Sequence, residues 1–156
     1  MSGGRPGAGS GERIGIFGGT FDPIHVGHLV AAVNVRYALR LDRLLLVVAN
    51  VPWQKAGLRS ITQAEDRFAL VSAAVGDVEG VEASRLEIDR GGESYTVETV
   101  EEVARAYPGA ELFCVVGADV ADVLGTWERA SVIAELATLV VVNRPGSVRT
   151  GSIDDD

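Results

Sequence analysis

The chain has 156 residues, of which 47% are hydrophobic, and a formal net charge of −8 at pH 7. This length suits one domain with a sizeable core, and the acidic balance argues against a nucleic-acid partner, whose binding surface is normally basic. No apolar run is long enough for a membrane helix, so we expect no membrane partner. The one cysteine, Cys114, excludes an internal disulfide and suits a reducing, cytoplasmic setting. Its apolar neighbours predict a buried, inert thiol.

Apolar runs alternate with helical patterns between two tails. Residues 1–11 are rich in glycine and predict a flexible tail, and residues 147–156 predict an acidic one, so the expected domain is residues 12–146. The predicted strands are Arg13–Phe17, Leu44–Ala49, Val81–Ile88, Glu111–Val116 and Thr138–Val142. The predicted helices are Val26–Leu39, Thr62–Val75 with a Thr62/Glu65 capping box, Ser94–Tyr107, a short one after Gly117, and Ser131–Leu136. This alternation predicts an α/β fold, a Rossmann-like doubly wound parallel sheet with helices on both faces.

Residues 18–28, GGTFDPIHVGH, join the first predicted strand to the first predicted helix. A glycine-rich turn in this position presents backbone N–H groups to a phosphate. Both histidines of the chain, His25 and His28, lie at the helix entry three residues apart and therefore share a face. Gly27 removes a side chain where a ligand would approach closely. A zinc site needs three or four protein ligands, so a phosphate site is the favoured interpretation of the pair.

The loops after the other strands carry further candidate residues, because ligands bind at the carboxyl ends of strands in such sheets. Lys55 could meet a phosphate as a point charge or be a solvated surface lysine. Thr96 lies at a predicted helix N-terminus, which favours an anion, although an ordinary capping sequence would look the same. Trp127 suits an aromatic ligand or the core, and Arg144 suits a phosphate or the surface.

These segments together resemble a known family. The turn at residues 18–28 is similar to the GxFDPxHxGH signature of the (H/T)xGH nucleotidylyltransferase superfamily, and more narrowly to the nicotinate mononucleotide adenylyltransferases. The segments NVPWQK, SYTVET, GAD with the TW that follows it, and RPG resemble further motifs of that family. The resemblance implies that catalytic His25 and His28 bind the ATP triphosphate with Gly18, Gly19, Thr20, Phe21 and Gly27. It implies that nicotinate mononucleotide is bound by Lys55, Thr96, Asp119, Trp127 and Arg144.

The resemblance also implies a reaction. AMP is transferred from ATP to nicotinate mononucleotide, which gives nicotinate adenine dinucleotide and pyrophosphate in NAD biosynthesis. The attacking phosphate is already an anion at neutral pH, so no general base is required. The expected cofactor is Mg²⁺ held mainly by the ATP phosphates, because no dense carboxylate cluster is visible in the sequence.

The resemblance covers about Arg13 to Gly146, and the chain departs from the family after that. The family continues with another strand and an ISSTxxR motif that holds the ATP phosphates, and residues 147–156 do not match it. We therefore expect a C-terminally truncated nucleotidylyltransferase fold, with the mononucleotide half of the site complete. Two alternatives stay open: a non-catalytic module that binds a mononucleotide, and a sister transferase for phosphopantetheine or a polyol phosphate. Residues 94–99, Trp127 and Arg144 favour the pyridine-nucleotide branch over the sister transferase.

Overall fold

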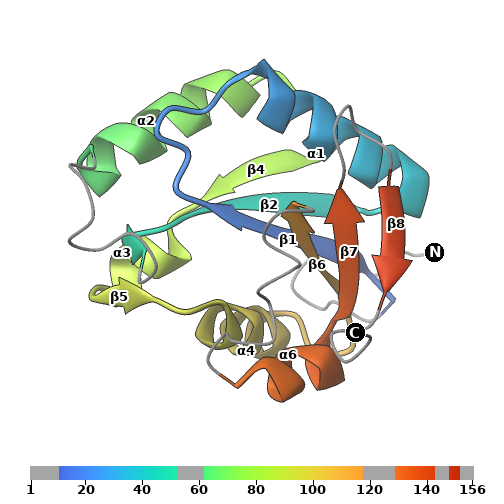
Figure 1. Ribbon diagram of the computed structural model, residues 1–156. Helices are drawn as coiled ribbons and strands as arrows, with labels where there is room; N and C mark the ends of the chain where they lie inside the picture. Colours follow the sequence, from blue (N-terminus) through green and yellow to red (C-terminus); the bar gives the residue numbers. More distant parts are fainter. Residues whose placement is uncertain (1–10, 53–61, 118–128, 143–147, 152–156) are drawn as a thin grey trace.

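The computed structural model describes residues 11–52, 62–117, 129–142 and 148–151 (Figure 1). The strands of the main sheet are β1 (Arg13–Gly19), β2 (Arg43–Val48), β4 (Val81–Ser84), β6 (Glu111–Gly117), β7 (Thr138–Val142) and β8 (Val148–Gly151). A second, two-stranded sheet consists of β3 (Val51–Pro52) and β5 (Glu93–Ser94). The helices are α1 (Val26–Leu39), α2 (Ala64–Val75), α3 (Leu86–Arg90), α4 (Thr96–Ala106) and α6 (Ala130–Leu136).

The main sheet has the strand order β4-β2-β1-β6-β7-β8. The first five strands in this order pair in parallel, and β8 pairs antiparallel with β7. The order reverses between β1 and β6, so the chain leaves the carboxyl ends of these two neighbouring strands in opposite directions across the sheet. This arrangement confirms the predicted doubly wound α/β fold, and it makes the β1–β6 boundary the switch point where such sheets bind ligands.

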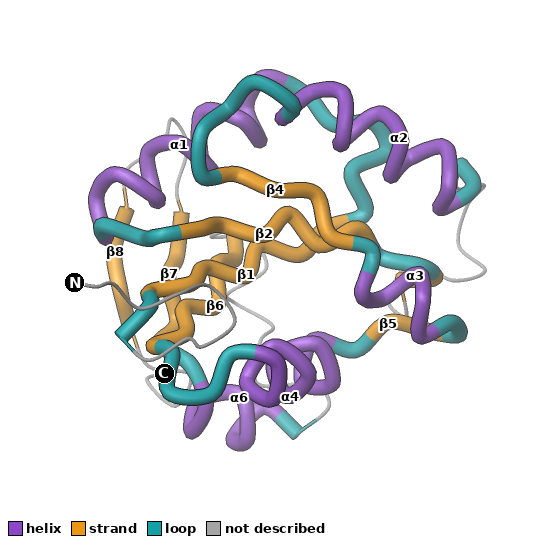
Figure 2. Tube along the Cα trace, turned by 180° about the vertical axis from the view of Figure 1, so that it is seen from behind, coloured by secondary structure: helices purple, strands orange, loops and turns teal. Residues whose placement is uncertain are grey.

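Helices cover both faces of the sheet, α1 and α2 on one and α4 and α6 on the other (Figures 1 and 2). The buried strand β2 shows how its sequence supplies both cores, because successive side chains alternate between the faces. Leu44 and Leu46 pack in the core under α1 and α2, and Leu45 and Val47 pack in the core under α4 and α6. A strand buried on both faces therefore reads as a continuous apolar run.

Gly15 in β1 has a packing function. A Cβ atom at this position would lie 2.3 Å from Leu44 Cδ1 and 2.7 Å from Leu41 Cδ1. The absence of a side chain thus lets β2 and the end of the α1–β2 connection pack closely against the central strand.

Several predicted element boundaries differ from the structure. The helix predicted from Ser94 begins at Thr96, because Glu93–Ser94 forms β5. The helix α2 begins at Ala64, its N-cap Gln63 makes no side-chain capping bond, and the predicted Thr62/Glu65 capping box does not form. The Thr62 amide instead donates to Asp22 Oδ2 at 2.9 Å. The predicted strand at residues 81–88 ends at Ser84, because the chain turns there into α3.

The predicted acidic tail also differs from the structure. Val148–Gly151 forms β8, the antiparallel edge strand beside β7. Residues 1–10 of the expected glycine-rich tail (residues 1–11) lie outside the described residues, and so does the expected short helix after Gly117. Of the helices that the structure describes, none has the length and apolar character needed to cross a membrane.

Cys114 is predicted to be unreactive in the folded protein. It is buried in β6, and burial raises the pKa of its thiol to about 12. Because the thiolate is the nucleophile, we expect no reaction with a thiol-specific disulfide reagent at about pH 8 and full reaction after unfolding in urea. The unfolded thiol ionises near pH ~8.5, so the free energy of unfolding should fall as the pH rises from there towards 12. Rapid labelling of folded protein at neutral pH would contradict this prediction.

Candidate functional site

The helix α1 begins with a capping box made of two imidazoles. His25 is the N-cap residue, and its Nδ1 accepts a hydrogen bond from the Gly27 amide at 3.1 Å. His28 lies at the third helical position, and its Nδ1 accepts from the His25 amide at 3.1 Å. A ring nitrogen that accepts carries no proton, so this hydrogen-bond pattern assigns the proton of each neutral imidazole to Nε2. Nε2–H is thus the group through which each ring can donate to an anion at this helix N-terminus.

The two rings also support one another. The ring centroids of His25 and His28 are 3.9 Å apart and the rings are inclined by 28°, which is a stacked arrangement. Phe21 meets His28 edge-on, with centroids 5.0 Å apart. Phe21 has a buried side chain and a φ of 51°, so it is held in the left-handed region with its ring against the histidine. This placement leaves only the backbone amide of Phe21 for the predicted phosphate contact.

Gly27 leaves room for the cap. A Cβ atom there would lie 3.0 Å from Cε1 and 3.1 Å from Nδ1 of His25. The sequence predicts close approach of a ligand as the reason for this glycine, whereas the structure shows that the His25 ring occupies the space. Gly18 and Gly19 end β1, and a Cβ atom on Gly19 would lie 3.0 Å from the Phe21 ring. Within the predicted turn, Gly27 thus makes room for the His25 ring and Gly19 makes room for the Phe21 ring.

Arg67 on α2 contacts the turn, although no motif in the sequence predicts a role for it there. It is 1% exposed, and its guanidinium donates to carbonyl oxygens of the turn after β1, of the loop after β2 and of the segment before α2. Burial lowers the pKa of Arg67, and the nearby Asp22 carboxylate raises it in part. A sequence signal for this residue exists: Arg67, Val71 and Val75 are spaced by four and share the buried stripe of α2.

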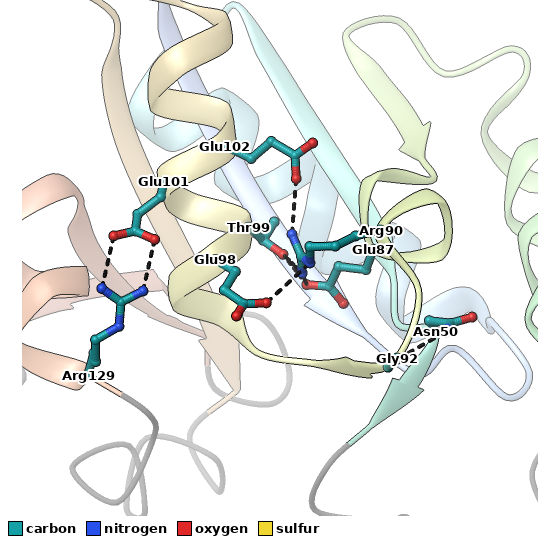
Figure 3. A network of polar contacts seen from close by, with 9 residues as sticks. All are labelled: Asn50, Glu87, Arg90, Gly92, Glu98, Thr99, Glu101, Glu102 and Arg129. Atoms are coloured by element: carbon teal, nitrogen blue, oxygen red, sulfur yellow. Dashed lines mark hydrogen bonds and ion pairs between the residues drawn. The ribbon is translucent and has the colours of Figure 1, made fainter.

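Thr96 is the first residue of α4, and a polar network holds the start of this helix (Figure 3). The buried Thr99 hydroxyl donates to the buried Glu87 carboxylate of α3. Arg90, also on α3, donates to Thr99 Oγ1 at 3.0 Å and to Glu102 Oε1 at 3.0 Å. The first turns of α4 are therefore fixed to α3, and the helix presents its N-terminal amides in a defined direction.

A second connection links this helix start to the loop after β2. Val51–Pro52 pairs with Glu93–Ser94 as the small β3–β5 sheet, and Asn50 Nδ2 donates to the Gly92 carbonyl at 3.0 Å (Figure 3). The loop after β2 is in turn bonded to the turn after β1, since the Ala49 amide donates to the Gly19 carbonyl at 3.0 Å. Hydrogen bonds thus link three of the five predicted site segments to one another: the turn after β1, the start of the loop after β2, and the segment that leads into α4.

The structure does not describe the other predicted site residues. The side chains expected to contact the mononucleotide outside α4 lie beyond the described residues; these are Lys55, Asp119, Trp127 and Arg144. Within residues 11–52, 62–117, 129–142 and 148–151, no group of three or more His, Cys, Asp and Glu side chains could hold a metal ion.

Comparison with known proteins shows which family shares this fold, with its imidazole-capped helix at the switch point. The chain belongs to the cytidylyltransferase-like family, whose model matches residues 16–154. The match includes the whole turn from Gly18 to His28 and extends beyond Gly146, the limit of the resemblance seen in the sequence.

Individual relatives of this chain are named nicotinate-nucleotide adenylyltransferases. The chain is 48% identical over 134 residues to the "probable nicotinate-nucleotide adenylyltransferase" of Corynebacterium kroppenstedtii, an alignment that covers 86% of this chain and 63% of that one. It is 47% identical over 134 residues to a protein of the same name from Thermus thermophilus, covering 86% of this chain and 70% of that one. The chain therefore spans less than two thirds of the length of the first of these relatives.

A solved structure has the same fold as this chain. The Plasmodium falciparum nicotinic acid mononucleotide adenylyltransferase, determined in complex with NaAD, matches with a TM-score of 0.73 and 16% sequence identity. The match covers 86% of this chain and 65% of that one, and at this identity it shows the shared fold alone.

We predict that the stability contributed by the His25 cap depends on an acceptor at this position and not on the imidazole itself. His25→Ala removes the N-cap acceptor and should lower the free energy of unfolding by about 1 kcal/mol. His25→Asn restores a preferred N-cap and should stay within about 0.5 kcal/mol of the parent. Urea unfolding followed by circular dichroism measures both. Equal losses for the two variants would show that the His25 ring does not act as a cap.

Thr99 is predicted to be a structural requirement of the α3–α4 junction. Thr99→Val deletes the hydroxyl that donates to Glu87 and accepts from Arg90, so the buried carboxylate loses this hydrogen bond. The free energy of unfolding should fall by about 2–3 kcal/mol. The control Thr99→Ser keeps the hydroxyl and removes one buried methyl group, at a cost of about 1 kcal/mol. If urea unfolding gave Thr99→Ser the larger loss, packing and not the hydroxyl would hold the junction.

Proposed function

We propose that this chain is a nicotinate-nucleotide adenylyltransferase, which transfers AMP from ATP to nicotinate mononucleotide. The observation that carries the proposal is the imidazole capping box at the β1–α1 turn, placed at the switch point of the sheet. Its support from relatives is their name and their 47–48% identity over 86% of this chain. We infer from the single cysteine that the reaction takes place in the cytoplasm.

In the proposed reaction a phosphate oxygen of the mononucleotide attacks the α-phosphorus of ATP. The bond from that phosphorus to the bridging oxygen breaks, and the electron pair leaves with pyrophosphate. No proton is transferred, so the protein must align two anions and stabilise the charge that grows on the leaving group. The groups proposed for this purpose are the Nε2–H donors of His25 and His28 and the amides of the turn.

Magnesium is proposed to enter the site as part of the Mg–ATP substrate. Mg²⁺ keeps several waters and often binds through substrate phosphates, so it does not require a cage of protein carboxylates. The described residues near the turn are consistent with magnesium binding through the substrate phosphates. Their stacked imidazoles and backbone amides are suited to binding phosphate oxygens, and they do not form a carboxylate site for magnesium. When bound, the ion supplies charge neutralisation at the phosphates.

The mononucleotide is proposed to bind on the other side of the switch point. Thr96 begins α4, and the amides of a helix N-terminus favour the nicotinate carboxylate over the neutral nicotinamide. From the family resemblance, Lys55 and Arg144 are proposed for the phosphate, Asp119 for the sugar and Trp127 for the pyridine ring.

The first test is adenylyl transfer by this chain. Mg–ATP is supplied with equal amounts of nicotinate mononucleotide, nicotinamide mononucleotide and phosphopantetheine, and products are identified by mass. We expect nicotinate adenine dinucleotide as the main product. A dephospho-coenzyme A product would replace the proposal with the sister transferase, and mononucleotide binding without any product would replace it with a binding module.

The histidines provide the matched variants for this assay. His25→Asn keeps an N-cap but lacks the Nε2–H donor. We therefore expect its kcat to fall by about 10²-fold while its free energy of unfolding stays close to that of the parent. His25→Ala combined with His28→Ala should lose at least as much activity. Turnover by the double variant at the parent rate would contradict the proposed site.

A further inference from the structure

We propose that Arg67 is a positioning residue that holds the phosphate-binding turn and the loop after β2 in one fixed arrangement. The inference rests on the proposed function, because these two segments are the ones assigned to ATP and to the mononucleotide. Arg67 is 1% exposed, so it acts through the backbone around it and not by touching a substrate. Its contacts define a set of four oxygens, called the carbonyl cluster: Thr20 O, Ala49 O, Asn50 O and Thr62 O.

The guanidinium reaches every member of the carbonyl cluster. Its Nε donates to Thr62 O at 2.6 Å, and its Nη2 donates to Asn50 O at 2.9 Å. A single nitrogen, Nη1, joins the two substrate segments, since it donates to Thr20 O at 3.0 Å and to Ala49 O at 2.7 Å. Thr20 follows β1 and Ala49 follows β2, so this nitrogen fixes the spacing between the loops that leave two adjacent parallel strands.

Two bonds from backbone amides reinforce the same alignment. The Ala49 amide donates to Gly19 O at 3.0 Å, and the Thr62 amide donates to Asp22 Oδ2 at 2.9 Å. The Asp22 carboxylate also raises the pKa of Arg67, against the larger lowering by burial, so the turn supplies the nearby negative charge. The turn is thereby tied to the start of α2 as well as to β2.

Only an arginine meets this requirement. A buried cation is tolerated when hydrogen bonds replace its water, and four carbonyl dipoles arranged around a planar fork do this. Lysine keeps the charge but has three donors on one atom, too few for four carbonyls in separate directions. A methionine of similar length would leave all four oxygens without this donor. Either change frees the turn to shift against the loop after β2, and a displacement of about 1 Å in substrate alignment costs roughly 10²-fold in rate.

The experiment compares Arg67→Lys and Arg67→Met with Val71→Ala. Val71 is buried one turn along the same face of α2 and is an apolar residue without a donor for the carbonyl cluster, so its truncation lowers stability alone. At a temperature where all variants are folded, we expect kcat/KM of Arg67→Lys to fall by about 10-fold or more, with a raised KM for both substrates. Val71→Ala should lower Tm by several degrees and leave both KM values within about twofold of the parent.

Hydrogen exchange supplies a readout that does not depend on the reaction. In the Arg67 variants the Ala49 and Thr62 amides should exchange at least about tenfold faster than in Val71→Ala, because their acceptors lie on the released turn. The Leu44 amide, which donates to Gly80 O at 2.8 Å at the far end of β2, should be unchanged. Chemical rescue is the third arm: millimolar guanidinium should restore part of the activity of Arg67→Ala and none to His25→Ala.

The outcomes separate the two proposals. If the parent shows no adenylyl transfer, the proposed function fails, and hydrogen exchange alone decides the placement of Arg67. If the parent is active but Arg67→Lys and Val71→Ala lose activity in proportion to their Tm, with equal exchange at Ala49, the positioning proposal is overturned. A raised KM together with faster exchange confined to the Arg67 variants supports it.

Discussion

β1 pairs in parallel with both β2 and β6, and this pairing sets the path of the chain around the sheet. Parallel neighbours cannot be joined by a tight turn, so each connection must cross a face of the sheet as a helix. One crossover leaves β1 through α1 and a later one returns to its other side, which places helices on both faces and two carboxyl ends side by side (Figure 1). The position of the turn proposed to bind phosphate is therefore set by the topology of the sheet.

At that position the same two histidines serve the fold and the proposed site. Their Nδ1 atoms satisfy backbone amides at the helix N-terminus, and this use fixes which edge of each ring carries the proton. A serine would cap the helix as well, but it would not provide a stacked pair of imidazoles protonated at Nε2. The cap also sets the orientation of the rings, because Gly27 admits the His25 ring and Phe21 supports the His28 ring. Local stability and ligand chemistry are therefore coupled through one set of hydrogen bonds.

The acidic net charge is compatible with anionic substrates because many negative side chains are engaged elsewhere. Glutamates of the described residues pair with arginines, as in Arg13–Glu111, Arg85–Glu65 and Arg129–Glu101. The groups proposed to meet the substrates near the turn are fixed dipoles, namely turn amides, helix N-termini and imidazole N–H groups. Among the residues that the structure describes, the buried cation near the turn is Arg67, and its donors are directed at carbonyl oxygens.

Elements with strong local signals could be predicted from the residue pattern. The bounds of α1 and β7 agree with prediction to the residue, and spacing and glycine content locate the turn with its two histidines. Contacts between distant segments could not be predicted in this way. These are the edge strand β8, the β3–β5 pairing, the hydrogen bond from the Thr62 amide to Asp22, and the partners of Arg67. Thr20 and Arg67, for example, are 47 positions apart in the chain and meet only because their loops leave neighbouring elements. Periodicity and capping preferences report on neighbours along the chain, whereas these bonds exist only after the sheet has brought the loops together.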